Sequence, residues 1–401
     1  MSTVETPATD QALARAKRIH ANSIVIDAHA DIEIPGRESA YVGADGRSKV
    51  APDKMQTGGV DAVVMAVASG PLPRNEPGYQ KARRRADRKL DAAKALVADT
   101  SNNLVLSHSA EEVEAAKVEG KRSLILGFQN TQIIGKDIAG LDQYYEAGCR
   151  VFALTHIGHN DCADSSRPDF SADTGKHEVL EEHGGLSTLG RQAIKRINRL
   201  GGLLDVCQLS KNATLQALDI SSAPVIASHS NVRALCDVSR NLSDEEIDLI
   251  GENGGVVHVT PFRGYLYDTA DRQLIEAIRV ARVNAKLPET YLYPFELYWE
   301  IKDPEEKIAF TDEVSRLLGP GKMDSLIDHI DYLVARIGID HVGIGTDFNH
   351  GGGMKSFNES SDALNVTVGL LQRGYSEEDV GKIWGRNFLR ALTAANSGAL
   401  Q

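Results

Sequence analysis

Residues 27–31, with the sequence DAHAD, place an imidazole and a carboxylate two positions apart where an apolar run ends. In an extended chain, side chains two residues apart point to the same side, so His29 and Asp31 can approach one ion. Imidazole nitrogens and carboxylate oxygens are both ligands of Zn²⁺ in proteins. The pair alone also fits a polar strand end that only makes hydrogen bonds, so a metal site needs support from elsewhere in the chain.

Three further apolar runs end in titratable residues. One continues into His156 and His159, one into His229, and one into Asp347 and His350. Metal-assisted hydrolysis needs ligands for the ion, a base that takes a proton from water and a group that orients the substrate. These segments contain side chains suited to each role, which strengthens the metal hypothesis.

The elements that must position these residues alternate between strands and helices. Eight short runs rich in Val, Ile and Leu predict strands buried on both faces, at 24–28, 62–67, 123–127, 151–155, 203–206, 224–227, 256–259 and 342–345, with an auxiliary strand at 104–106. Helices are predicted at 80–98, 110–118, 188–200, 244–251, 323–337 and 363–372. This alternation predicts an α/β fold, a (β/α)8 TIM-like barrel of the metal-dependent hydrolase type, whose strands end at one rim. No Gly-rich turn follows the first strand, as a doubly wound sheet would favour.

The length of 401 residues suits one such barrel or two average domains, and the eight strands favour a single domain over 1–401. The surplus length falls in a polar loop at 156–186 and an insertion at about 260–316. Seven aromatic residues lie between 265 and 299. They can line an apolar substrate pocket as a lid, or form a small core of their own, and both interpretations stay open.

Composition restricts the class of protein. Hydrophobic residues make up 42% and charged residues 25% of the chain, as in a soluble globular protein, and 44 basic against 56 acidic residues give a net charge of −12. This charge repels nucleic acid, and the basic run at 81–89 is interpreted as the solvated face of a helix. The sequence contains no signal peptide pattern, no membrane-length apolar run and no CxxC pair. We expect a cytoplasmic protein with a small-molecule substrate and with no nucleic acid or membrane partner.

Six ordered motifs resemble those of the membrane (renal-type) dipeptidases, peptidase family M19, which are zinc hydrolases of the amidohydrolase superfamily with a distorted (β/α)8 barrel. The resemblance covers about residues 23–392. The motifs are DAHAD at 27–31, LTH at 154–156, GGLS at 184–187, ASHSN at 227–231, RNLSD at 240–244 and GTDF at 345–348. The resemblance implies a metallohydrolase that cleaves a peptide or amide bond, and dimers are common in the family.

The resemblance also implies a metal centre. His29 and Asp31 match ligands of one zinc ion, and His229 matches a ligand of a second. Gln129 stands where the family has a bridging glutamate, and Gln208 stands where it has a histidine ligand. A neutral amide is a poor metal ligand beside a carboxylate and offsets no charge between two dications. We therefore expect one zinc ion rather than two.

The remaining matched residues imply roles in catalysis and substrate binding. Asp347 matches an aspartate that lies near the first metal in the family and accepts and returns a proton. It is also a candidate for a further ligand of that metal. His156 matches a substrate-contacting histidine that would stabilise the oxyanion. Arg240 matches the arginine that pairs with the substrate carboxylate, and His159 is a second candidate for substrate contact.

Three interpretations of this centre remain. One ion can stay on His29 and Asp31 with help from Asp347 or His229. Alternatively, other histidines replace the missing ligands, with His159, His258 and His350 as candidates. In the third interpretation the metal is lost, and the scaffold serves a lyase, hydratase, isomerase or binding protein. We expect the first, a dipeptidase-type hydrolase acting on a small carboxylate-bearing substrate.

Overall fold

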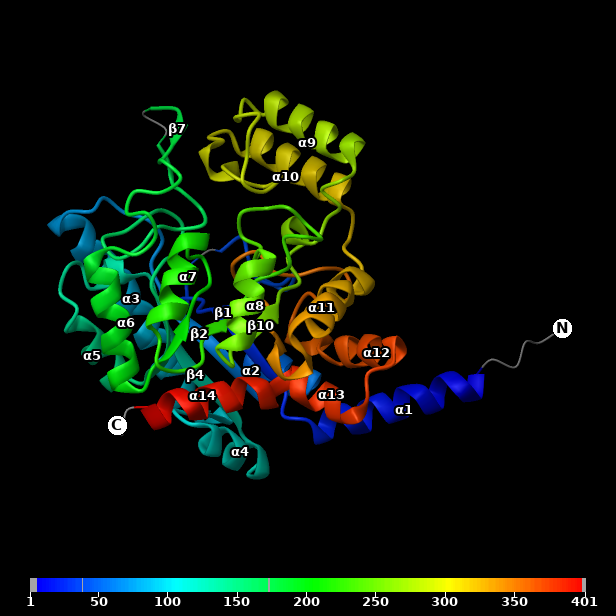
Figure 1. Cartoon of the computed structure of the whole chain (residues 1–401). Helices are drawn as coiled ribbons and strands as arrows, with labels where there is room; N and C mark the ends of the chain where they lie inside the picture. Colours follow the sequence, from blue (N-terminus) through cyan, green and yellow to red (C-terminus); the bar gives the residue numbers. More distant parts are fainter. Residues whose placement is uncertain (1–5, 38, 172–173, 399–401) are drawn as a thin grey trace.

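A ring of parallel strands forms the centre of the molecule in a computed structural model that describes residues 6–37, 39–171 and 174–398 (Figure 1). In spatial order the strands are β1 (Ile26–Asp31), β2 (Ala62–Ala68), β4 (Arg122–Gln129), β5 (Cys149–Ala153), β8 (Leu203–Asp205), β9 (Ile226–Ala227), β10 (Val256–Val259) and β11 (Val342–Ile344). Strand β3 (Leu104–Leu106) pairs with β4 outside the ring, as the auxiliary strand predicts. The predicted (β/α)8 barrel is confirmed.

The barrel closes where the first strand meets the end of the last one. The Asp31 amide donates to the Phe348 carbonyl at 2.9 Å, and the Asp347 amide donates to the His29 carbonyl at 2.9 Å. Beneath them, the Asp27 carboxylate accepts from the Thr346 hydroxyl at 2.6 Å and from its amide at 2.8 Å. Two segments that carry candidate ligands therefore form the closing joint of the barrel.

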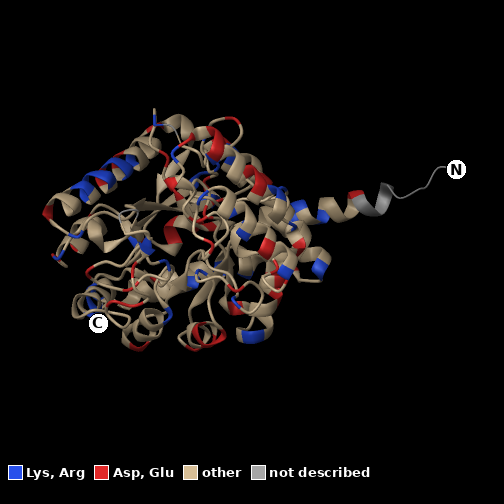
Figure 2. Cartoon of the chain, turned by 90° about the horizontal axis from the view of Figure 1, so that it is seen from above, with Lys and Arg blue, Asp and Glu red and all other residues tan. Residues whose placement is uncertain are grey.

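Helices cover the outside of the ring and leave the strands buried on both faces, which is why the strands are continuous apolar runs. The described α-helices of the molecule, including those at the ends of the barrel, are α1 (Thr6–Asn22), α2 (Pro52–Gly58), α3 (Glu76–Ala98), α4 (Ala110–Val118), α5 (Gly140–Glu146), α6 (Thr188–Leu200), α7 (Lys211–Ile220), α8 (Asp244–Glu252), α9 (Arg272–Asn284), α10 (Pro304–Leu318), α11 (Met323–Ile337), α12 (Leu364–Arg373), α13 (Glu377–Gly381) and α14 (Asn387–Gly398). Acidic and basic residues are interspersed over these helices (Figure 2). None of the described helices is long and apolar enough to cross a membrane.

The two ends of the barrel are covered differently (Figure 1). At the end where the strands begin, α14 packs its Phe388 and Leu392 against residues of the strands such as Ile26 and Ile226. At the opposite end lie the insertion helices α9 and α10, and a two-stranded hairpin of β6 (Phe170–Ser171) and β7 (Lys176–His177). The insertion therefore lies over the rim where the strands end, and α14 covers the opposite end.

The insertion serves both purposes that its composition left open. Its helices share a small core, which consists of Ala281, Leu287, Leu297, Ile301, Phe310 and Val314. Other aromatic residues of the insertion pack separately, with Phe262, Tyr265 and Tyr293 in contact above the rim. The insertion therefore has its own apolar core and also supplies an aromatic wall to the barrel opening.

The predicted strands and helices are present in the structure, but several begin or end at other residues than predicted. Helices α4, α6 and α11 have the predicted bounds, and each predicted strand is present. The strand predicted at 24–28 begins at Ile26 and continues to Asp31, so residues 27–31 are part of the strand. The sequence patterns do not predict the helices α1, α2, α5, α7 and α14.

Candidate active site

Three buried side chains from three different strands converge at the rim. The ligand atoms of His29, His229 and Asp347 all lie within 4.8 Å of one another. The rings of the two histidines stack at 3.9 Å between centroids, with 25° between their planes. Two imidazoles and one carboxylate are a donor set of catalytic zinc sites that keep one position open. The residues present at this point therefore fit a single metal ion.

A neighbouring pair of hydrogen bonds fixes the protonation of His229. The Ser228 hydroxyl donates to Asp205 at 2.6 Å and so must accept from Nδ1 of His229, at 2.8 Å. The Nε2 atom is then the unprotonated one and faces Gln208, whose amide nitrogen lies 3.5 Å away. Burial lowers the pKa of His229 well below its usual value, with His29 adding to the effect. A neutral imidazole with a free Nε2 is the form that binds metals.

Asp31 is held away from this cluster by a lysine. Its Oδ2 atom lies 3.3 Å from Nζ of Lys89, and both side chains are largely buried. Burial alone would raise the pKa of Asp31, but Lys89, His350 and His29 lower it below its usual value. Among the residues with described positions, Asp31 is in no group of three possible ligands within 4.8 Å. Its charge is already neutralised by the protein.

The interpretation of 81–89 as a solvated face is wrong for Lys89. On α3, residues Ala82, Ala86 and Ala93 are buried, and Lys89 shares their 4-3-4 spacing and hence their side of the helix. The long aliphatic stem lets its ammonium reach the rim. This spacing is the sequence signal that distinguishes Lys89 from the neighbouring exposed Arg88.

Two buried amides at the strand ends, Gln129 and Gln208, have unmet hydrogen-bonding capacity. Neither polar atom of the Gln129 side chain has a partner, and neither does Oε1 of Gln208, within the described ranges. Such orphaned groups cost on the order of 1–3 kcal/mol each unless a ligand or water satisfies them. The carboxylate and imidazole that a second metal requires are absent at both positions, so these residues do not fit a two-metal centre.

The backbone at the rim is strained. Gln208 and Asp347 have φ of +66° and +54°, and Asn130 after β4 has φ of +88°. Residues with side chains reach this left-handed region at a cost of about 1–3 kcal/mol, and such strain is concentrated at functional sites. All three follow the ends of barrel strands, so the strain coincides with the converging side chains.

His156 and His350 lie beside the cluster, with ring centroids 4.9 Å apart. Burial holds the pKa of His156 well below its usual value, and its Nδ1 atom has no partner in the part of the chain described. For His350 burial acts in the same direction, but Asp31 and Asp347 raise its pKa above the usual value. Nδ1 of His350 lies 3.8 Å from the Asp347 carboxylate. One histidine is neutral and the other favours its charged form.

The other candidate histidines are placed differently. His159 uses both ring nitrogens inside its loop, with the Ser165 amide donating to Nδ1 at 2.9 Å and Nε2 bonded to the Val179 carbonyl at 2.7 Å. His258 packs against Phe388 of α14 at the opposite end of the barrel, and burial lowers its pKa to about 4. His159 is engaged by its own loop, His258 lies against α14, and neither belongs to a group of three possible ligands among the described residues.

Arg240 lies beside the cluster as a cation without a counterion. Its Nη2 atom donates to the His229 carbonyl at 2.9 Å, and its guanidinium lies 5.5 Å from the centroid of the Tyr265 ring. The residue is 3% exposed, and its Nε atom has no partner. Within residues 6–37, 39–171 and 174–398, no carboxylate lies within 4.0 Å of it. Its charge is available to an anionic group.

A cavity of about 290 Å³ lies next to this point, since Tyr265, the ring under Arg240, is one of its walls. His156 and His350 line it, together with Arg167, a residue that no motif in the sequence marks. Its remaining walls are largely aromatic and include Tyr41, Phe262, Tyr265, Tyr293 and Trp299, with one carboxyl group, that of Asp169. The cavity therefore combines the Arg167 cation, two histidines and one acid with aromatic walls.

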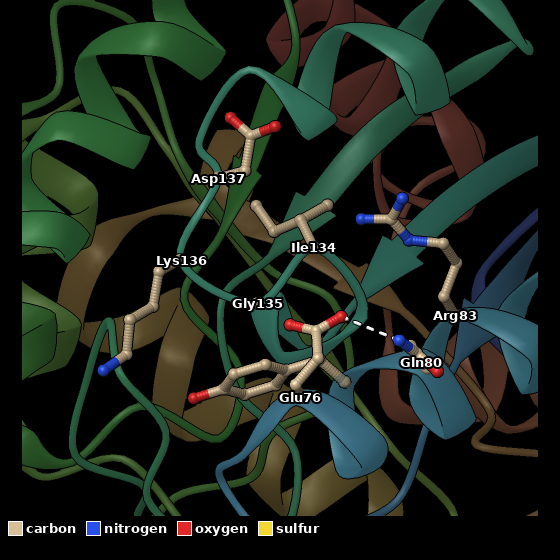
Figure 3. Close-up of a pocket in the computed structure, with 8 residues that line it drawn as sticks. Glu76, Gln80, Arg83, Ile134, Gly135, Lys136 and Asp137 are labelled. Carbon is tan, nitrogen blue, oxygen red and sulfur yellow. Dashed lines mark hydrogen bonds between the residues drawn. The ribbon is translucent and has the colours of Figure 1, made fainter.

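A larger surface pocket, of about 760 Å³, lies between the start of α3 and the loop after β4 (Figure 3). Its lining includes Glu76, Gln80, Arg83 and Lys136, and the Gln80 amide donates to Glu76 at 2.9 Å. Its side chains carry both signs of charge and include none of the rim residues. The smaller cavity has the chemistry of an active site.

Comparison with known proteins was made on both sequence and structure. The profile described as membrane dipeptidase (peptidase family M19) matches residues 13–401. Dipeptidase tcpJ of Claviceps purpurea is 27% identical over 307 residues, which are 76% of this chain and 58% of that protein. Dipeptidase aclJ of Aspergillus oryzae is 28% identical over 322 residues, 79% of this chain and 63% of that protein. The chain thus spans about 60% of the length of these relatives.

Solved structures show the same architecture. The crystal structure of the probable dipeptidase PvdM from Pseudomonas aeruginosa superposes with a TM-score of 0.84 at 32% identity, covering 97% of this chain and 100% of that one. A metallopeptidase from Rhodobacter sphaeroides, solved with a phosphinate mimic of the dipeptide L-Ala-D-Ala, gives a TM-score of 0.71 at 19% identity, covering 93% and 100%. The second likeness concerns the fold alone.

Proposed function

The chain belongs to the membrane dipeptidase family, peptidase family M19, and on this premise we propose that it is a metal-dependent hydrolase of the dipeptidase type. The reaction is cleavage of an amide bond in a small substrate that bears a carboxylate. The observation that carries the proposal is the cluster of His29, His229 and Asp347, with ligand atoms within 4.8 Å of one another, beside a cavity that His350 also lines.

These three residues would hold one zinc ion, which supplies a bound water with a pKa of about 7 and polarises the scissile carbonyl. The neutral state of His229, enforced by Ser228, supports this assignment. The neutral Gln129 and Gln208, and the Asp31–Lys89 ion pair, support one ion rather than two. A second dication near Asp31 would be repelled by the Lys89 ammonium and would meet neutral amides at Gln129 and Gln208.

The chain's own residues account for proton transfer and binding. Asp347 has an oxygen without a hydrogen-bond partner in the described structure, and we assign it the proton of the attacking water and its return to the leaving amine. His156 would donate to the oxygen that becomes negative in the transition state. Arg240 would pair with the substrate carboxylate through its free donors.

Metal analysis of the purified protein, combined with a dipeptide panel, tests the proposal. We expect about one equivalent of zinc, loss of hydrolysis after chelation and its recovery when zinc is restored. Two equivalents would contradict the single-ion assignment. Zinc below roughly a tenth of an equivalent, with activity undiminished by chelation, would contradict the metal mechanism altogether.

The orphaned amides favour a second candidate, in which the scaffold performs a non-hydrolytic reaction or binds a ligand without turnover. The double substitution Gln129→Glu and Gln208→His distinguishes the two. If these positions only lost a second metal, the variant gains zinc and dipeptidase activity. If the amides contact the natural substrate, the variant gains zinc and loses the native reaction.

We also propose that the protein works in the cytoplasm, in line with its four cysteines, which are all free and buried. We further propose a homodimer, because dimers are common in the family. Light scattering on the purified chain measures the second point directly.

A further inference from the structure

Arg167 is a buried cation in the loop between β5 and α6. The residue is 6% exposed and lines the cavity next to His156 and His350. Its Nη2 atom donates to the Tyr293 hydroxyl at 2.8 Å, and its guanidinium lies 4.5 Å from the centroid of the same ring. Its aromatic support therefore comes from the insertion, on the far side of the cavity opening.

Arg167 forms no ion pair in the described part of the chain, and Glu296 and Asp347 act on its charge only from a longer distance. In the described part of the chain, the Tyr293 hydroxyl is the only group that accepts a hydrogen bond from its side chain, and no carboxylate lies within 4.0 Å. A guanidinium has five N–H donors, so most of them remain free. Burying an unpaired charge is costly, and an active site can recover that cost when an anionic ligand arrives.

Arg282 shows what a structural arginine in this protein looks like. It is also buried, but its Nε and Nη1 atoms donate to three backbone carbonyls, those of Pro288, Pro294 and Glu296, at 2.7–3.2 Å, and its Nη2 atom alone has no partner in the described structure. Arg282 braces the insertion and faces no cavity among those described. Arg167 has one phenolic partner and a cavity instead.

Arg167 and Arg240 lie at the two ends of a tyrosine pair. The rings of Tyr265 and Tyr293 meet edge to face at 5.9 Å, with Arg240 at 5.5 Å from the first and Arg167 at 4.5 Å from the second. Glu296, an acid near Arg167, is occupied by the Leu292 amide at 2.7 Å and by His177 at 3.1 Å. Arg167 thus lines the cavity and Arg240 adjoins it behind Tyr265, and neither guanidinium forms an ion pair in the described structure.

We infer that Arg167 binds a second anionic group of the substrate, so that the natural substrates are acidic: dipeptides or N-acyl amino acids with one carboxylate for Arg240 and another for Arg167. This inference rests on the proposed function of the same site. A planar guanidinium with free donors binds a carboxylate through two parallel hydrogen bonds, and Tyr293 fixes its orientation.

The test compares acidic substrates with their neutral isosteres. We expect the wild-type enzyme to favour Ala-Glu over Ala-Gln, or Glu-Ala over Gln-Ala, by about tenfold or more in kcat/KM. Arg167→Met should abolish this preference and leave the neutral dipeptides within about twofold, and Arg167→Lys should retain part of it. Arg263→Met is the matched control, because Arg263 lies in the adjoining insertion with its donors on the Ser315 and Gly319 carbonyls. It should keep the full preference.

A bracing role for Arg167 predicts a different result. The Met variant would then lose thermal stability or lose activity on all dipeptides equally, with the ratio of acidic to neutral substrates unchanged, and that outcome overturns the inference. Tyr293→Phe removes only the supporting hydrogen bond and should reduce the ratio without abolishing it.

Ligand binding separates a failure of this inference from a failure of the proposed function. If no dipeptide is hydrolysed, the proposed function is wrong, but calorimetry with glutarate and butyrate still tests Arg167. We expect glutarate to bind the wild-type protein about tenfold more tightly than butyrate and this advantage to vanish in Arg167→Met. Equal binding of the two acids to the wild-type protein contradicts the inference.

Discussion

Ser228 determines whether His229 can serve as a ligand. Its hydroxyl donates its only proton to Asp205, so its oxygen must accept the proton of Nδ1 of His229. The Nε2 atom of His229 is then unprotonated. Removing this contact allows the ring to rotate or to protonate at the wrong nitrogen. Groups that orient a metal-binding histidine in this way typically contribute 10–100-fold to metal affinity, a range of about 1.4–2.7 kcal/mol.

We therefore expect Ser228→Ala to weaken zinc binding by about 10–100-fold without unfolding the protein. A competition titration against a zinc chelator measures the change, and circular dichroism checks the fold. Ser228→Thr keeps a hydroxyl and should restore most of the affinity. Unchanged zinc affinity in the alanine variant would remove His229 from the ligand set.

At the same scale, the sequence identified His29, His229 and Asp347 because chemistry in a barrel follows the ends of strands, and those ends are visible as apolar runs. It did not identify Lys89 or Arg167. Their importance depends on where a helix face and a long loop are packed, and this is a property of tertiary structure. His159 shows the converse, since a polar residue beside a motif can be fully used by its own loop.

Helix α3 contributes a charge to the site through Lys89, so an element on the outside of the barrel controls metal binding at its rim. Lys89→Met keeps the aliphatic stem and removes the ammonium that occupies Asp31. We expect the variant to bind zinc about tenfold or more tightly, because a cation is removed and a carboxylate is released. The zinc dissociation constant measures this. Arg88→Met, on the exposed face of α3, is the control and should change nothing.

Helix α11 is attached to the barrel by a neutral histidine. Nδ1 of His329 accepts from the Val232 amide at 3.0 Å, and burial lowers the pKa of His329 to about 4. The unfolded chain takes up a proton near pH 6.5 while the folded one does not. The stabilisation is therefore complete above about pH 6.5 and is lost as pH falls toward about 4, at up to about 1.4 kcal/mol per pH unit.

Urea unfolding between pH 8 and pH 5 measures this loss. His329→Asn removes one titrating group, so its free energy of unfolding should depend less steeply on pH than that of the wild type, by about one proton. The variant is expected to be less stable at pH 8, where it lacks the original packing. Identical slopes for the two proteins would show that His329 does not titrate with folding.

The strands and helices differ in how strongly the sequence pattern predicts them. Strands buried on both faces are predicted by apolar runs, and α6 is predicted by its strong apolar stripe between a capping Ser187 and a left-handed Gly201. Helix α7 also has a serine cap, Ser210, but it is short and only weakly apolar on one side. Helices α9 and α10 lie in the insertion at 260–316, which we interpret from its aromatic residues rather than from a helical pattern.

The whole molecule depends on α14, which closes the end of the barrel opposite the active site. Leu392 is fully buried among residues of the strands. We expect Leu392→Ala to lower the free energy of unfolding by about 2–5 kcal/mol, because it leaves a cavity where the barrel cannot collapse. Chemical denaturation measures the change. Leu13→Ala, at a partly exposed position on α1, should cost less than about 0.5 kcal/mol.

The closing joint of the barrel also sets the order of events during synthesis. Asp27 and Thr346 are bonded although 319 positions separate them in the chain, and the candidate ligands His29 and Asp347 lie at the same joint. A ribosome delivers the first of them hundreds of residues before the second, so the two can meet only after nearly the whole chain has been made. The nascent protein therefore cannot assemble its metal-binding cluster early. Metal can bind there only after the barrel has closed.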